Sequence, residues 1–184
     1  MFKYGIDHLT VNKAIAISNG DLKTVLTEEA IKKINTCRQK VEIMASSDKA
    51  VYGINTGFGA LYNVKIKGEN LQKLQENLVM SHACGTGEEV PQEIVKLMLL
   101  LKIQSVSYGH SGVQLETVER LIDFYNNNIF PVIYSQGSLG ASGDLAPLAH
   151  LVLPLLGLGE VNFKGKKIAG SELNEHFGWD NIKL

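Results

Sequence analysis

A glycine-rich segment, GSLGASGDLAPLAH at residues 137–150, constrains this chain more than any other stretch. Its three glycines lie three residues apart, which indicates tight turns, positive backbone angles or a close approach of the backbone to another group. An apolar run follows at once and predicts a buried helix, with Asp144 as its cap and Pro147 in its first turn. The segment therefore predicts a tight loop that leads directly into the start of a helix.

The centre of this loop, Ala141-Ser142-Gly143, permits an unusual reaction. In a tight enough turn the Gly143 amide nitrogen reaches the Ala141 carbonyl carbon, because glycine adds no side-chain clash. Ring closure with loss of water, followed by loss of a second water from Ser142, gives a 4-methylidene-imidazol-5-one. This product is a carbon electrophile, which no ordinary side chain provides. The positive end of the following helix dipole would stabilise negative charge that develops there.

Three other interpretations of the loop compete with this one, and the sequence disagrees with the first two. A glycine-rich turn before a helix binds phosphate in some proteins, but no Lys-Ser or Lys-Thr ends this one. Ser142 could be a hydrolase nucleophile, but its flanking glycines do not make G-x-S-x-G. A purely structural glycine loop is the third interpretation.

Hydrophobic periodicity predicts a mainly α chain with short strands, in one domain or two. The expected helices cover residues 28–48 after a Thr27 cap, 69–84, 91–108, 114–127, 145–158 with a kink or end at Pro154, and 171–177. Residues 11–18 predict a short helix or a strand. Strands or extended segments are expected at residues 4–9, at the start of 51–59, at 129–134 and in a hairpin at 160–168 that turns at Lys164-Gly165.

Composition and charge exclude several kinds of protein. The net charge of -1 gives no indication of nucleic acid or of an anionic membrane as partner. Cys37 and Cys84 have neither metal nor redox spacing, and no H-E-x-x-H pattern is present, so no metal is expected. Two widely separated cysteines fit a reducing cytoplasm, and no signal peptide is visible. Residues 145–158 are too short to span a bilayer.

Two further segments carry candidate site residues. The run VYGINTGFG at 51–59 predicts a short strand that becomes a glycine-rich lid ending at Gly59. Tyr52 in this run could simply cap a turn with its hydroxyl. A phenol is a weak base, and it needs nearby positive charge or hydrogen bonds to act as a phenolate.

The other segment is SHACGTG at residues 81–87. His82 lies on the same helical stripe as Leu71, Leu74 and Leu78, which predicts an inward-facing ring near the C-terminus of a helix. A cation is favoured at that end of a helix, so a structural histidine is the alternative to a binding one.

The three segments occur in the order VYGINTGFG, SHACGTG and GSLGASGDLAPLAH, and together they resemble the aromatic amino-acid ammonia-lyases, the histidine-specific members in particular. The resemblance implies that Ala141, Ser142 and Gly143 form the methylidene-imidazolone autocatalytically, without a metal. It implies that Tyr52 removes a proton from the substrate, that His82 contacts the substrate ring, and that backbone near Gly59 closes over it. The implied reaction converts L-histidine into urocanate and ammonia.

The resemblance also implies an architecture. Residues 1–184 would be the N-terminal prosthetic-group domain of the ammonia-lyase fold, truncated before the central helical bundle. Family members are homotetramers, and their carboxylate-binding arginine and other late catalytic residues would lie beyond Leu184. Two alternatives follow. The substrate could be tyrosine or phenylalanine, although a histidine at position 82 goes with polar rings, or the chain could be a non-catalytic fragment.

Overall fold

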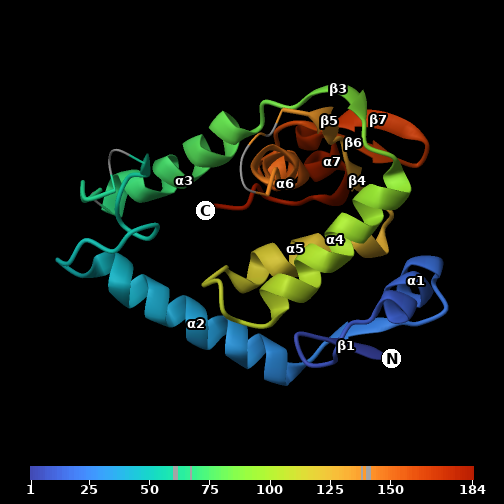
Figure 1. The fold of residues 1–184 in the computed structure, drawn as a ribbon, viewed down its shortest axis with the longest axis horizontal. Helices are drawn as coiled ribbons and strands as arrows, with labels where there is room; N and C mark the ends of the chain where they lie inside the picture. The colour runs from blue at the N-terminus through green and yellow to red at the C-terminus, as the bar shows by residue number, and fades with distance from the viewer. Residues whose placement is uncertain (60–61, 67, 138, 140–141) are drawn as a thin grey trace.

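The computed structural model describes residues 1–59, 62–66, 68–137, 139 and 142–184 (Figure 1). Helices dominate this part of the chain, and the prediction of a mainly α fold with short strands is confirmed. The helices are α1 (Val11–Asn19), α2 (Glu28–Ser46), α3 (Gly68–His82), α4 (Gln92–Ser107), α5 (Leu115–Asn126), α6 (Leu145–Val152), the 3-10 helix η2 (Leu153–Leu156) and α7 (Gly170–Phe177). The strands are β1 (Phe2–Tyr4), β2 (Thr24–Leu26), β3 (Thr86–Glu89), β4 (Phe130–Pro131), β5 (Tyr134–Gln136), β6 (Glu160–Phe163) and β7 (Lys166–Ala169).

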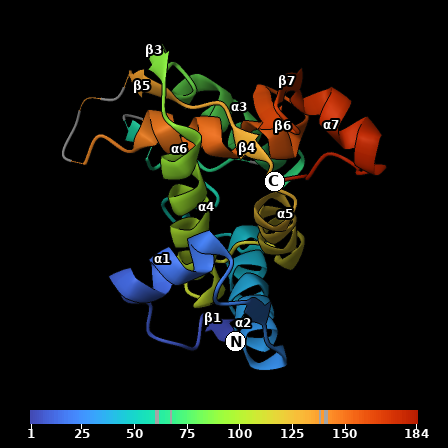
Figure 2. The ribbon, with the colours of Figure 1, turned by 90° about the vertical axis from the view of Figure 1, so that its right-hand side faces the viewer.

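The described strands form three small sheets around a helical centre (Figures 1 and 2). β1 pairs with β2 in parallel, β3 pairs with β5 antiparallel, and β4, β6 and β7 form an antiparallel sheet in that order. Helices α4 and α5 pack against each other in the middle of the molecule, and α3 packs against α6. The β3–β5 pair therefore lies near the place where α3 ends and α6 begins.

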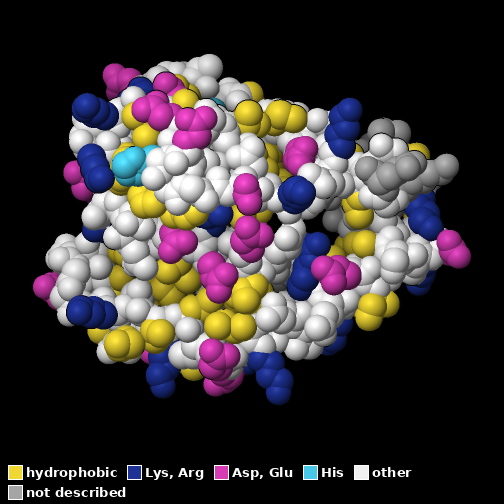
Figure 3. Space-filling view, turned by 180° about the vertical axis from the view of Figure 1, so that it is seen from behind, with side chains coloured by type: hydrophobic (Ala, Val, Ile, Leu, Met, Phe, Trp, Pro, Cys, Tyr) yellow, Lys and Arg dark blue, Asp and Glu magenta, His cyan; other side chains and the backbone are white. Residues whose placement is uncertain are grey.

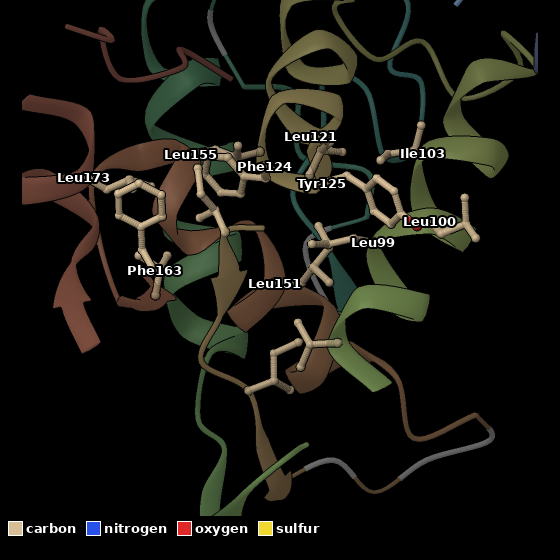
Figure 4. Packing of buried hydrophobic residues seen from close by; sticks show 14 of the residues in the cluster. Leu99, Leu100, Ile103, Leu121, Phe124, Tyr125, Leu151, Leu155, Phe163 and Leu173 are labelled. Atoms are coloured by element: carbon tan, nitrogen blue, oxygen red, sulfur yellow. The ribbon is translucent and has the colours of Figure 1, made fainter. Parts of the chain in front are cut away.

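The core is built around one face of α4. Ile94 and Leu101 of this helix are exposed, whereas Leu99, Leu100 and Ile103 are fully buried on that face. Figure 4 shows their partners from several other elements: Leu121, Phe124 and Tyr125 of α5, Leu151 of α6, Leu155 of η2, Phe163 of β6 and Leu173 of α7. One continuous cluster thus joins the N-terminal helices to the elements that follow the glycine-rich loop.

The contribution of this core is testable on α4 itself. Leu99 is 0% exposed, so we expect Leu99→Ala to lower the free energy of unfolding by about 2–5 kcal/mol, through lost burial and the cavity left behind. Leu101 lies on the same helix but is 55% exposed, and Leu101→Ala should change that free energy by less than about 0.5 kcal/mol. Chemical denaturation of both variants measures the difference, and equal losses would contradict this account of the core.

In the N-terminal half, the cap prediction is confirmed and one strand prediction is wrong. Thr27 Oγ1 accepts a 3.3 Å hydrogen bond from the Ala30 amide, as an N-cap should. The first strand ends at Tyr4 instead of extending over residues 4–9, because the Asp7 side chain accepts from the Lys3 amide and closes a turn. Residues 11–18, for which helix and strand were both open, lie in α1.

In the C-terminal half, the predicted hairpin is confirmed as β6 and β7, with Lys164 at a positive φ of 50° in its turn. The helix expected over residues 145–158 is interrupted at Pro154, as predicted. It ends as α6 at Val152 and continues as the 3-10 helix η2, which contains Pro154 at its start. Proline has no amide hydrogen to donate, so it favours this change at the end of an α-helix.

On the face seen in Figure 3, acidic and basic side chains are interspersed between patches of hydrophobic ones, in keeping with a net charge of -1. Among the residues that the structure describes, no helix is both long and apolar enough to cross a bilayer. The same residues contain no group of three or more His, Cys, Asp or Glu side chains placed to hold a metal ion.

Candidate active site

His82 is the last residue of α3, where the sequence predicts it. Its Nδ1 atom lies 2.7 Å from the Leu78 carbonyl oxygen one turn earlier. A carbonyl oxygen only accepts, so Nδ1 carries a proton, and in the neutral ring Nε2 is left as an acceptor. The ring is half-buried rather than fully inward-facing, as are the leucines of its stripe. In its neutral form, His82 therefore presents a hydrogen-bond acceptor at the end of a helix.

The segment after His82 meets the beginning of the glycine-rich loop. Thr86 of β3 pairs with Gln136 of β5, which places Gly85 beside Gly137. A Cβ atom on Gly137 would lie 2.7 Å from the Gly85 Cα, and Gly137 has a φ of +130°, so only glycine fits this close approach. Two segments that are far apart in the sequence are thereby brought into direct backbone contact.

His150 of α6 lies behind this contact. The Gly85 amide donates a 2.9 Å hydrogen bond to His150 Nε2, and the imidazole packs edge-on against the Tyr134 ring at a centroid distance of 5.3 Å. Burial lowers the pKa of His150, because the charged form loses solvation. An amide N–H only donates, so the His150 ring is neutral with its proton on Nδ1.

In the loop itself, Ser142 is exposed, and its hydroxyl donates a hydrogen bond to Asp144. That hydrogen bond is the main reason why the pKa of the Asp144 carboxyl is lowered. Asp144 stands at the N-cap position of α6, but its side chain makes no cap hydrogen bond. Asp144 therefore stands at the predicted cap position, but the predicted cap hydrogen bond is wrong. Its carboxylate accepts from the Ser142 hydroxyl instead.

Ser142 and Gly143 meet two requirements of the methylidene-imidazolone. The Ser142 side chain is not packed into the core, and Gly143 has a φ of +69°, a backbone conformation that a side chain would strain. Ser138, Gly140 and Ala141 lie outside the described residues, so the role predicted for Ala141 stays a prediction. The chemistry of Ala-Ser-Gly fits the group.

Tyr52 is separate from this cluster. The strand expected at the start of residues 51–59 is wrong: these residues form turns, because the buried Asn55 side chain accepts from the Val51 amide and donates to the Lys49 carbonyl. Tyr52 is 63% exposed and packs edge-on against Phe58. Gly59 has a φ of +57°, with open space where a Cβ would be.

The position of Tyr52 relative to His82 follows from α3. The segment that contains Tyr52 lies near the N-terminal end of this helix, whereas His82 ends it (Figure 1). A helix of 15 residues is about 20 Å long. Among the described residues, no hydrogen bond joins Tyr52 to His82 or to Ser142. Within one chain, the structure therefore brings the segment that follows His82 against Gly137, at the start of the loop that contains Ser142, and leaves the Tyr52 segment at the other end of α3.

Two residues that shape the site were not predicted from the sequence. The Asn55 side chain fixes the turn at Tyr52, and His150 accepts a hydrogen bond from the Gly85 amide. A polar residue within a glycine-rich run was the only signal for Asn55. His150 stands at the end of an otherwise apolar helix turn, which could have suggested a buried polar contact.

Comparison with known proteins identifies the class. The family model described as aromatic amino acid lyase matches residues 9–184, and the chain belongs to this family. It is 46% identical over 177 residues to the histidine ammonia-lyase of Symbiobacterium thermophilum, and 43% identical over 178 residues to that of Streptococcus pyogenes serotype M3. These alignments cover 96% and 97% of this chain but only 35% of each relative, so the chain spans about a third of their length.

Solved structures agree on the fold. The histidine ammonia-lyase of Trypanosoma cruzi matches with a TM-score of 0.87 and 31% identity, over 100% of this chain and 36% of that one. The ergothioneine-degrading ergothionase of Treponema denticola matches with a TM-score of 0.91 and 27% identity, over 100% of this chain and 37% of that one. The helices, short strands and hairpin therefore form an N-terminal part of the ammonia-lyase fold.

Proposed function

We propose that this chain is the N-terminal part of an ammonia-lyase that converts L-histidine into urocanate and ammonia. The reaction breaks the Cα–N bond and a Cβ–H bond and forms a carbon–carbon double bond, so that ammonia leaves with the proton. The proposal is supported by the 46% identical relative, whose name is histidine ammonia-lyase, and by the polar acceptor at position 82.

His82 is the observation that carries the choice of substrate. Its Nε2 acceptor suits a ring that donates a hydrogen bond, such as the N–H of a substrate imidazole. A phenol also donates, so a tyrosine ammonia-lyase is the second candidate. Phenylalanine offers no donor, which makes a phenylalanine ammonia-lyase the weaker alternative.

The other residues take separate roles. Ala141, Ser142 and Gly143 would hold the methylidene-imidazolone, which supplies a carbon electrophile when present. Tyr52 would act as the base that takes the substrate β-proton, and the backbone near Gly59 would help to exclude water. Since the segment that contains Tyr52 lies at the end of α3 opposite to His82, a site that uses both residues would take Tyr52 from another copy, in keeping with the expected homotetramer. A cytoplasmic location remains a prediction.

Neither arginine of this chain is placed to bind the substrate carboxylate. Both are already engaged: Arg38 pairs with Glu42 at 2.8 Å, and Arg120 donates to the Asp180 carbonyl and stacks on Trp179. A carboxylate-binding arginine is therefore expected in the part of the relatives that this chain does not span. The alternative of a non-catalytic fragment thus applies to the chain by itself.

The experiment compares this chain with a protein that extends it to the length of its relatives. We expect the longer protein to release urocanate from histidine and to have an intact mass lower by two water molecules. The chain alone should show no measurable release, since losing even one positioned group costs orders of magnitude. A longer protein with its full mass and no urocanate would contradict the proposal, and release by the chain alone would contradict the role given to the missing part.

A further inference from the structure

His150 is a buried titratable side chain near the candidate site, and the proposed mechanism does not use it. It is 9% exposed and lies on α6, eight residues after Ser142. Its Nε2 atom accepts from the Gly85 amide at 2.9 Å. A Cβ atom on Gly85 would lie only 2.8 Å from that nitrogen, so the imidazole is packed directly against the backbone.

Gly85 is connected tightly to His82 on one side. The Cys84 amide donates a 2.9 Å hydrogen bond to the His82 carbonyl, which folds the chain back immediately after α3. Only Ala83 and Cys84 separate His82 from Gly85, so little freedom remains between them. Any shift of the Gly85 backbone is therefore passed to the His82 ring.

Gly85 is connected equally closely to the loop on the other side. Gly137 packs on Gly85 with no room for a side chain, and the Cys84 thiol donates to the Gly137 carbonyl at 3.5 Å. Tyr134, at the other end of β5, packs edge-on against His150 and fixes its ring. Three segments thus meet at the His150 imidazole of α6: the residues that follow α3, the start of β5 and α6 itself.

We propose that His150 is a positioning residue, which sets the distance between His82 and the loop that contains Ser142 by accepting the Gly85 N–H. This role rests on the proposed function, because it concerns how the two halves of that site are held together. Without the acceptor, the partly buried Gly85 amide loses its partner, and a movement of the backbone that connects to His82 is the simplest way to restore a hydrogen bond.

The first test measures substrate discrimination in the extended protein. His150→Phe keeps a ring but removes the acceptor, and it should lower the ratio of kcat/KM for histidine to that for phenylalanine by about tenfold. His150→Gln keeps an acceptor at a similar reach and should retain the ratio within about threefold. If His150 only supported the fold, His150→Phe would lower the fraction of active enzyme. Turnover of both substrates would then fall alike, and the ratio of their kcat/KM values would not change. An unchanged ratio in His150→Phe would therefore overturn the proposal.

The second test follows hydrogen exchange and needs no activity. In His150→Phe, amides in the peptide 83–90 should exchange about tenfold faster, while the β7 strand keeps its wild-type rate. His150→Gln and the exposed control His110→Phe should leave both unchanged. Equal acceleration in both peptides, or none in 83–90, would overturn the proposal even if histidine proves not to be the substrate.

A third variant reaches the same contact from the other side. Gly85→Ala places a methyl group against His150 and Tyr134 without removing either, so it should lower the same ratio. This variant decides the question if His150→Phe gives no soluble protein. Wild-type discrimination in Gly85→Ala would contradict the proposed coupling, whereas the absence of histidine turnover in the wild type would contradict the proposed function alone.

Discussion

Replacing Ser142 with alanine is expected to lower histidine turnover by at least about 10³-fold in the protein that extends this chain. Alanine has no hydroxyl whose loss could leave a methylene, so the electrophile cannot form. His82, Tyr52 and the fold would all remain. Ser142 is exposed, and its one contact described here is the hydrogen bond to Asp144, so the substitution should cost little stability.

Three measurements on the variant check this. Turnover is measured as urocanate release, the near-ultraviolet absorbance reports the conjugated ring, and the intact mass reports the lost water. Ser171→Ala is the matched control, because Ser171 is also exposed but lies on α7. Turnover and absorbance equal to the wild type in Ser142→Ala would show that this serine is not converted.

The local parts of the site were predictable from the sequence. The stripe of Leu71, Leu74 and Leu78 placed His82 at the end of a helix, and the structure has it at the last residue of α3. Spacing of this kind depends only on helix periodicity, which a sequence displays directly. The glycines of the loop likewise predicted tight turns, and Gly137 and Gly143 have positive φ angles.

The parts that depend on contacts across the chain were not predictable in this way. The Gly85–Gly137 approach requires the register of β3 against β5, and short strands carry little pattern to set it. The Asp144 carboxylate could accept either from the first amides of α6 or from the Ser142 hydroxyl. Capping propensity favours the amides, whereas the structure has the hydrogen bond to Ser142. In the same way, the Asn55 side chain makes four hydrogen bonds with the backbone, and these form turns where a strand was predicted at Tyr52.

Substrate choice gives the second large effect. We expect His82→Leu to lower kcat/KM for histidine by on the order of a hundredfold, while kcat/KM for phenylalanine changes by less than about threefold. The reason is the orientation of the imidazole. The Leu78 carbonyl holds the proton on Nδ1, so Nε2 is available to accept from a substrate N–H, and leucine offers no acceptor at all.

A comparison of three substrates distinguishes a His82 that binds the substrate ring from a His82 that only supports the end of α3. Histidine, tyrosine and phenylalanine are assayed in the wild type, in His82→Leu and in His110→Leu, an exposed histidine outside the site. His110→Leu should leave all three values near the wild type. A parallel loss for all three substrates in His82→Leu would show that His82 supports the end of α3 rather than the substrate. A wild-type preference for tyrosine over histidine would instead favour the phenol as the ring that donates to Nε2, and the chain would then be part of a tyrosine ammonia-lyase.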